Sequence, residues 1–211
     1  MYEFTGWVNL EEDLTREKRI IENMLHAVGK APSAILNENV SRNALLGFVS
    51  FNPREAEEKE AGQPMSKSLG NSKFTITFIG QLKNCEEVVE KLHNLSMSCK
   101  ENSDAEIILT AYMAWGQEFI KHIKGSYTLA IWDESRKALL LARGHMGEKH
   151  MFYGYKSDAI IFASNVKMLL AHPLLEPKAA RQLNAGIPSE IKELQSGQCL
   201  IFDRQGIKIK E

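Results

Sequence analysis

Three cysteines are the side chains of this 211-residue chain best suited to nucleophilic chemistry: Cys85, Cys99 and Cys199. A thiol attacks a carbonyl carbon as its thiolate, and the start of a helix stabilises that anion. Cys85 follows Asn84, where a helix is predicted to begin, so it is the candidate nucleophile of the three. No amine base accompanies it in the sequence, and Cys99 and Cys199 are interpreted as ordinary loop and strand residues.

Two histidines form a second candidate group. His145 and His150 lie five residues apart with Glu148 between them, which resembles a loose metal-binding motif. A helical H-E-x-x-H zinc site places its two histidines four residues apart on one helix face. The spacing therefore does not favour a metal ion, and we expect no metal.

Composition excludes several classes of function. The chain has 26 Lys and Arg against 27 Asp and Glu, so it lacks the basic excess of a nucleic-acid-binding protein. It contains no apolar run as long as a membrane span, and its first residues do not resemble a signal peptide. Three unpaired-looking cysteines exclude a fully paired disulfide framework. We expect a cytoplasmic protein with no nucleic-acid or membrane partner.

Hydrophobic periodicity predicts the elements that must position any site. A strand is predicted over residues 6–9, a helix over 14–28, and strands over 44–51 and 74–79. The polar, glutamate-rich segment 54–72 is predicted to be a surface loop.

The second half begins with two predicted helices and continues mainly as strands. Asn84 with Glu87, and Ser103 with Glu106, have the spacing of a capping box. After residue 126 the pattern predicts strands over 127–132, 138–142, 151–155 and 159–163, a helix over 165–171, and a closing hairpin of 199–202 and 207–209. This order favours helices that cover stacked, largely antiparallel sheets.

A series of motifs resembles one protein family. The motifs are Gly62-Gln63-Pro64-Met65, Ser103-Asp104-Ala105-Glu106, Trp115-Gly116, residues 125–133, residues 139–143 and Ile191-Lys192-Glu193-Leu194. In this order, across nearly the whole chain, they are similar to the N-terminal glutaminase domain of asparagine synthetases, a class II glutamine amidotransferase domain. The resemblance implies an α+β fold of the N-terminal-nucleophile hydrolase type, a four-layer αββα sandwich. We expect one domain over 1–211, without the family's ATP-using synthetase domain and with no cofactor.

The resemblance also implies which position should hold the nucleophile. The family uses a cysteine that becomes the first residue when Met1 is removed, and its own α-amino group, with a pKa near ~8, serves as the base. The equivalent position here is Tyr2. A phenol has a pKa of about 10 and is a poor acyl-transfer nucleophile, and the bulk of Tyr2 should block removal of Met1. We therefore expect no catalytic residue.

Other positions of the family's substrate pocket are replaced as well. The asparagine that donates to the oxyanion corresponds to Ile79, and Gly80 retains only a backbone N–H. The arginine that binds the substrate carboxylate corresponds to Ser50 or Val49. Asp104, expected at the substrate ammonium, is retained, although the first turn of a helix favours a carboxylate for structural reasons.

These replacements predict a pseudoenzyme. We expect a non-catalytic partner or vestigial domain of an ATP-dependent amide-forming synthetase, packed against an asparagine synthetase-like subunit or another such subunit, and a homodimer is left open. The alternative is a domain with residual glutaminase or amidohydrolase activity through Cys85, or one that binds a small molecule.

The place where such a molecule would bind is the remnant pocket, defined here as Ser50, Ile79, Gly80, Gln81 and Asp104. Apolar residues stand where the family has polar ones on its walls. We expect the pocket to be at least partly filled by Tyr2, Phe48, Phe78 and Ile79.

Overall fold

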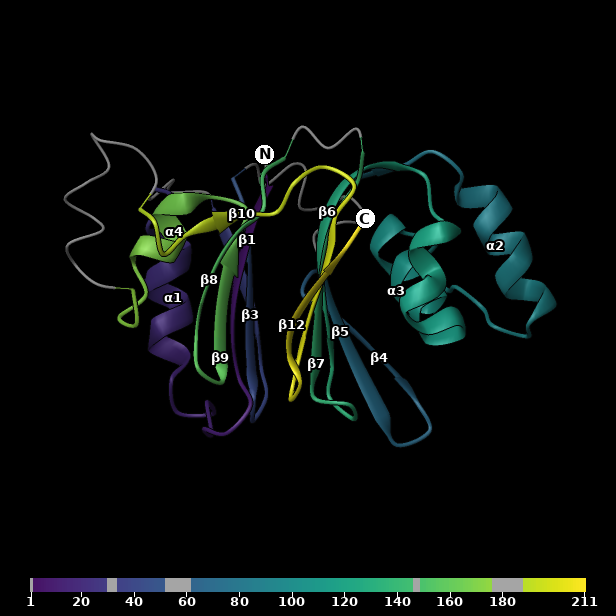
Figure 1. The fold of residues 1–211 in the computed structure, drawn as a ribbon. Coiled ribbons are helices and arrows are strands. Elements are labelled where there is room, and N and C mark those ends of the chain that lie inside the picture. Colours follow the sequence, from purple (N-terminus) through teal and green to yellow (C-terminus); the bar gives the residue numbers. More distant parts are fainter. Residues whose placement is uncertain (1, 30–33, 52–61, 146–148, 176–187) are drawn as a thin grey trace.

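The computed structural model describes residues 2–29, 34–51, 62–145, 149–175 and 188–211. In this part of the chain two six-stranded antiparallel sheets lie face to face, and helices cover the outer face of each (Figure 1). This four-layer αββα arrangement confirms the predicted fold class. The predictions for Met1, for Glu148 and for residues 54–61 of the surface loop lie outside the described residues.

The first sheet has the strand order β10-β8-β9-β1-β3-β2. Its strands are β1 (Tyr2–Asn9), β2 (Ile35–Val40), β3 (Ala44–Ser50), β8 (Phe152–Lys156), β9 (Ala159–Ala163) and β10 (Lys192–Glu193). Helices α1 (Lys18–His26) and α4 (Val166–Leu170) lie on its outer face (Figure 1). Because β1 pairs with both β3 and β9, residue 2 begins an interior strand of this sheet.

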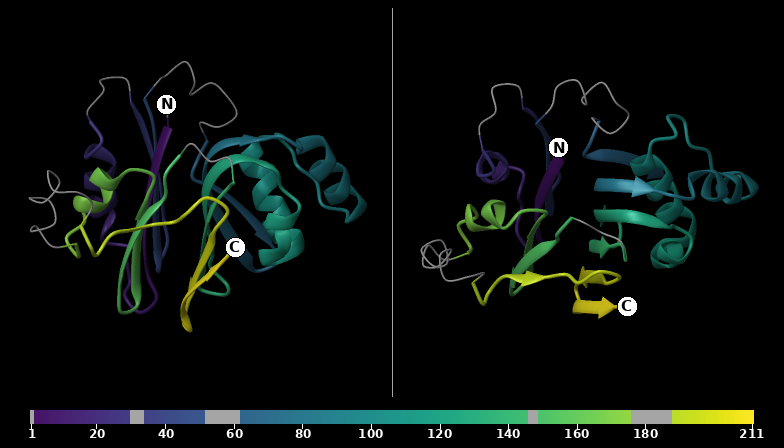
Figure 2. Two further views of the ribbon diagram at one scale, coloured as in Figure 1. Left: turned by 45° about the horizontal axis from the view of Figure 1, so that its top comes forward. Right: turned by 90° about the horizontal axis from the view of Figure 1, so that it is seen from above.

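The second sheet has the strand order β12-β11-β7-β6-β5-β4. Its strands are β4 (Met65–Leu69), β5 (Ser72–Leu82), β6 (Gly125–Asp133), β7 (Ala138–Arg143), β11 (Cys199–Asp203) and β12 (Gly206–Lys210). Helices α2 (Cys85–Asn94) and α3 (Asp104–Trp115) and the 3₁₀ helix η2 (Gly116–Lys121) belong to its outer layer. Figure 2 shows the two sheets between their helices from two further directions.

Alternation along the strands divides the core into layers. On β1, Phe4 and Val8 point between the sheets and pack in one cluster with Trp132. Trp7 points the other way and packs with Leu25 of α1. Successive side chains of a strand lie on opposite faces, so one apolar strand can serve both layers. Burying each such side chain contributes roughly 1.5–3 kcal/mol, and this holds the layers together.

The helix predicted over 14–28 begins later, at Lys18. The backbone N–H of Leu14 donates to the carbonyl oxygen of Arg42 at 2.8 Å, which ties Leu14 to the segment before β3. Leu14 fits the apolar pattern of the helix, although it lies before it, because its side chain is fully buried in the same cluster as Ile21 and Leu25 of α1.

Two further local predictions were wrong. Within the predicted loop 54–72, residues 65–69 form strand β4, and β5 begins at Ser72. Asn84 makes no capping hydrogen bond to the backbone of α2, because its side chain instead accepts from Lys124 N at 2.8 Å and donates to His122 O at 2.9 Å. The other predicted cap is present, since Ser103 Oγ accepts from Glu106 N at 3.2 Å.

Candidate functional site

The position predicted for a nucleophile lies at the start of β1. Tyr2 is the register partner of Ser50 on β3, so the structure brings these two predicted residues together. The Tyr2 ring stacks on Phe48, with ring centroids 5.5 Å apart and an interplanar angle of 30°. Ser50 is buried, at 2% exposed. This end of the first sheet therefore presents an aromatic pair beside a buried hydroxyl.

Ile79 approaches the same region from the second sheet. It is 5% exposed and belongs to the cluster between the sheets that contains Phe48, and Tyr2 packs against that cluster. Phe78 belongs to a different cluster, under α2 and α3. The prediction that Phe78 helps to fill the remnant pocket was therefore wrong, because neighbouring strand residues point to opposite faces.

Gly80 and Gln81 are exposed residues near the end of β5, just before the buried Leu82. The backbone of Gly80 has φ +138°, and a Cβ atom at this position would lie 2.1 Å from the carbonyl oxygen of Ser126. Only glycine fits such a close approach of two backbones. The close approach of β5 to β6 is therefore enough to account for a glycine at position 80.

Asp104 opens helix α3 and holds the end of β5. Its Oδ2 accepts from the backbone N–H of Leu82 at 2.8 Å, and its Oδ1 accepts from the thiol of Cys85 at 3.2 Å. One carboxylate thus joins β5, α2 and α3. This contact places Asp104 next to the end of β5, which is close in the chain to Gly80 and Gln81, and gives it a structural role.

Cys85 does not have the electrostatics of a nucleophile. Burial, followed by the hydrogen bond to the Asp104 carboxylate, raises the pKa of the Cys85 thiol to about 11. A thiol with that pKa is almost entirely protonated at neutral pH, whereas reactive cysteines have a lowered pKa. The helix start that favours a thiolate is outweighed here by burial and by the neighbouring carboxylate.

A buried polar pair beside Tyr2 was missed from the sequence. Glu3 is 6% exposed, and its carboxylate accepts a hydrogen bond from Ser164 Oγ. Ser164 Oγ also accepts from Phe4 N at 2.9 Å. The signal that could have found it is a glutamate inside an otherwise buried strand, at a position alternating with Phe4.

One of the two histidines of the loose motif, His150, belongs to a polar cluster. His150 Nδ1 lies 2.6 Å from Glu193 Oε1, and Arg143 Nη1 donates to the same oxygen at 2.7 Å. This cluster links β7 of the second sheet to β10 of the first. Among the described residues there is no group of three or more His, Cys, Asp and Glu that could hold a metal ion. Within the same residues, no helix is long and apolar enough to cross a membrane.

Comparison with known proteins gives consistent matches. The family model described as "Glutamine amidotransferase domain" matches residues 1–211. Asparagine synthetase (glutamine-hydrolyzing) 3 of Bacillus subtilis is 28% identical over 97% of this chain and 35% of its own length. Asparagine synthetase (glutamine-hydrolyzing) 2 of the same organism is 36% identical over 80% of this chain and 22% of its own length. The chain thus spans about a third or less of these curated relatives.

A solved structure also matches the fold. Glutamine phosphoribosylpyrophosphate amidotransferase from Bacillus subtilis superposes with a TM-score of 0.70 at 17% identity. The match covers 99% of this chain and 49% of that chain. At this identity the likeness concerns the fold alone.

Proposed function

The chain belongs to the glutamine amidotransferase domain family, and from this premise we propose that it is an asparagine synthetase-like domain that does not hydrolyse glutamine. In this proposal it acts as a non-catalytic domain or partner of an ATP-dependent amide-forming synthetase. The relatives named above are glutamine-hydrolyzing asparagine synthetases, and this chain spans only part of their length. We therefore also propose that a synthetase domain or subunit is the partner of this chain.

The observation that carries the proposal is the state of Tyr2. Hydrolysis of an amide through an acyl-enzyme requires a strong nucleophile with a base within hydrogen-bond reach. Tyr2 offers a phenol, which is a weak nucleophile at neutral pH, on a ring that is stacked on Phe48 and packed against the cluster between the sheets. In this proposal such a phenol does not replace the cysteine thiolate of the family.

Cys85 carries the competing proposal, residual amidohydrolase activity. Its thiol donates to Asp104 and its pKa is raised to about 11, so the geometry disfavours attack by Cys85. A Cys85→Ala variant tests this directly, because any activity that depends on Cys85 disappears in it.

The deciding experiment measures release of ammonia and glutamate from glutamine by the purified protein. A Tyr2→Cys variant, with Met1 removal confirmed by mass spectrometry, is assayed beside it, and Tyr2→Phe serves as the matched control. We expect no turnover by the unmodified protein or by Tyr2→Phe. Turnover only in Tyr2→Cys would mean that the remnant pocket still binds glutamine. Enzyme-like turnover by the unmodified protein would refute the proposal.

A further inference from the structure

The four edge strands of the two sheets differ in how they are protected. An exposed edge has unpaired backbone N–H and C=O groups, and proteins cover these edges, shorten them or guard them with lysine and proline. β10 has two residues, and β2 carries Glu38, which forms an ion pair with Lys18 of α1. β12 carries the exposed side chains of Lys208 and Lys210. β10 is thus protected by its short length and β12 by exposed lysines, whereas the charge of Glu38 on β2 is paired with a helix.

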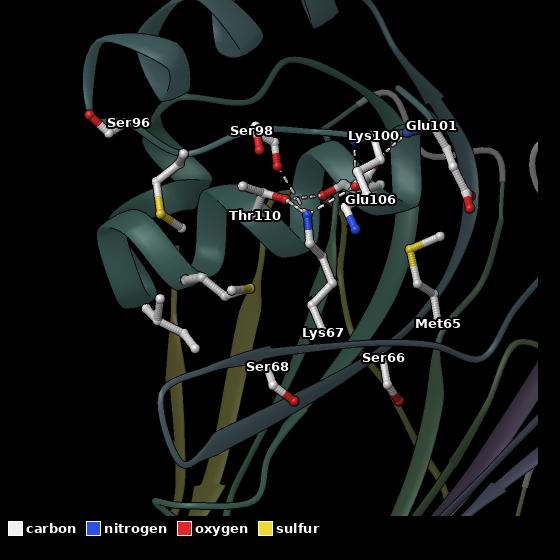
Figure 3. Close-up of a pocket in the computed structure, with 13 residues that line it drawn as sticks. Met65, Ser66, Lys67, Ser68, Ser96, Ser98, Lys100, Glu101, Glu106 and Thr110 are labelled. Carbon is white, nitrogen blue, oxygen red and sulfur yellow. Dashed lines mark hydrogen bonds and ion pairs between the residues drawn. The ribbon is translucent and has the colours of Figure 1, made fainter.

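β4 resembles β2 in this respect, because the ammonium of its single lysine is paired with side chains of α3. Lys67 Nζ lies 2.9 Å from Glu106 Oε1 and 2.9 Å from Thr110 Oγ1, and it donates to Ser98 O at 3.3 Å. Figure 3 shows Lys67 pointing from β4 toward α3, with Ser66 and Ser68 on the other side of the strand. The Lys67 ammonium is thus neutralised beneath the helix and does not repel a second strand at this edge.

The hairpin geometry shows which backbone groups face outward. A two-residue turn, Gly70-Asn71, joins β4 to β5 and closes on the pair Leu69–Ser72. Such a turn closes on a hydrogen-bonded pair, and hydrogen-bonded and non-hydrogen-bonded pairs alternate along an antiparallel ladder. Ser66 and Ser68 therefore direct their backbone N–H and C=O groups away from β5, toward the side on which no other strand of the described residues pairs with β4.

The residues of β4 are also self-complementary. The strand reads Met65-Ser66-Lys67-Ser68-Leu69, an apolar–Ser–Lys–Ser–apolar palindrome. An antiparallel pair of two such strands centred on Lys67 places each Ser66 opposite Ser68 of the other copy. These are the residues whose backbone groups face outward, so the register that matches the side chains also matches the hydrogen bonds. A two-fold symmetric interface requires this kind of self-matching patch.

Pairing of two β4 strands in this register would also cover exposed apolar side chains. Leu69 is 49% exposed, and it lies opposite Met65 of the other copy. Beside them a cavity of about 540 Å³ between β4, α3 and the segment before it includes Met97 and Met113 in its lining. Methionine side chains adapt to a neighbouring apolar surface. The two Lys67 residues face each other, but each ammonium is paired with its own Glu106.

We propose that β4 is a homodimerisation edge, at which a second copy of this chain adds its own β4 and joins the two second sheets into one. A ladder of five residues is small compared with the interface of a permanent dimer, so the association is weak and depends on concentration. The proposal does not depend on whether the domain hydrolyses glutamine.

Sedimentation velocity over a hundredfold range of protein concentration tests the proposal. The unmodified protein should shift from monomer to dimer as concentration rises. Ser68→Pro removes an outward N–H, and Ser68→Lys brings a charge to the edge, so both should remain monomeric throughout. Ile209→Pro, at the corresponding outward-facing position of β12, is the matched control and should still form dimers.

A second measurement locates the contact. Hydrogen exchange at the amides of Ser66 and Ser68 should slow at high concentration in the unmodified protein. Circular dichroism verifies that the variants fold, and Ser68→Lys decides the matter if Ser68→Pro does not. A monomer at every concentration, a dimer that persists in folded Ser68 variants, or a dimer lost in Ile209→Pro alone would each overturn the proposal.

Discussion

The helical layers of the two sheets each bury an ionisable side chain, and they do so in opposite ways. Glu106 on α3 is 4% exposed and His172, just after α4, is 1% exposed. The Glu106 carboxylate accepts from Lys67 Nζ and from three backbone N–H groups, those of residues 100, 101 and 102. His172 accepts one hydrogen bond, from Leu174 N at 3.1 Å, and its Nε2 has no hydrogen-bond partner among the described residues.

The difference shows that neighbouring hydrogen-bond donors, and not burial alone, decide whether a buried ionisable side chain is charged or neutral. Burial raises the pKa of Glu106, but the hydrogen bonds from Lys100 N, Lys67 and Glu101 N more than offset this, and the pKa is lowered. Burial alone lowers the pKa of His172 to about 4. In the layer over the second sheet Glu106 therefore stays charged. In the layer over the first sheet His172 stays neutral, and its ring centroid lies 4.6 Å from that of Trp7.

The largest expected effect breaks the charged side of this comparison. Glu106→Gln removes the charge that pairs with Lys67 and leaves backbone donors poorly satisfied, which should destabilise the fold by about 3 kcal/mol. Denaturant unfolding at neutral pH measures it. Glu101→Gln is the control, because the Glu101 side chain is exposed, and it should change stability by less than ~0.5 kcal/mol. If Glu106→Gln lowered the free energy of unfolding no more than Glu101→Gln does, the hydrogen bonds to the Glu106 carboxylate would not stabilise the fold.

The pH dependence of that effect sharpens the comparison. Because the folded pKa of Glu106 is lowered, its contribution is present above the unfolded value of 4.5 and is lost as pH falls through the folded value. The stability difference between the unmodified protein and Glu106→Gln should therefore shrink below about pH 4.5. A constant difference from pH 7 to pH 3 would contradict a lowered pKa.

His172 should lower the stability of the fold on acidification at a higher pH than Glu106 does. The unfolded chain binds a proton near pH 6.5 and the folded one near pH 4, so stability falls as pH drops between these values. At pH 5 the cost is about 2 kcal/mol relative to pH 7. His172→Phe retains the ring on Trp7 and should lack this part of the pH dependence in denaturant unfolding. The same slope in both proteins would mean that another group titrates.

A smaller effect is expected for a partly exposed cluster that joins the sheets. Glu193 accepts from Arg143 at 2.7 Å and contacts His150, and its side chain is 28% exposed. Since solvent screens such a pair, Glu193→Gln should cost only about 1 kcal/mol. Thermal unfolding measures the shift. Glu118→Gln, which removes an exposed pair with Lys121, should leave the unfolding curve unchanged.

Several elements could be predicted because their signals are local. The Ser103 cap of α3 needs only a hydroxyl three residues before Glu106 N, and the apolar alternation of β1 and β6 indicates strands wherever they occur. β2 and β4 could not be predicted in the same way. Their residues are largely polar or partly exposed, and they are strands because β3 and β5 supply the pairing.

The candidate site was predictable as a set of positions but not as a set of contacts. The sequence placed Tyr2 beside Ser50, and Gly80 near Asp104, through the resemblance to a family. It could not show that Asp104 accepts from Cys85 and so raises the pKa of that thiol, since the two residues lie 19 positions apart. It also could not show that Phe78 faces the helices, because that depends on which face of β5 meets the other sheet.

The sequence by itself determined the fold class, the family resemblance and the identity of residue 2, because periodicity, composition and motif order are properties of the chain. The tertiary structure alone decided which polar groups meet. Lys67 could have guarded an edge, as Lys208 does, but packing against α3 turned it toward Glu106. The energy of a buried charge depends on donors brought from distant segments, and only the folded chain brings them together.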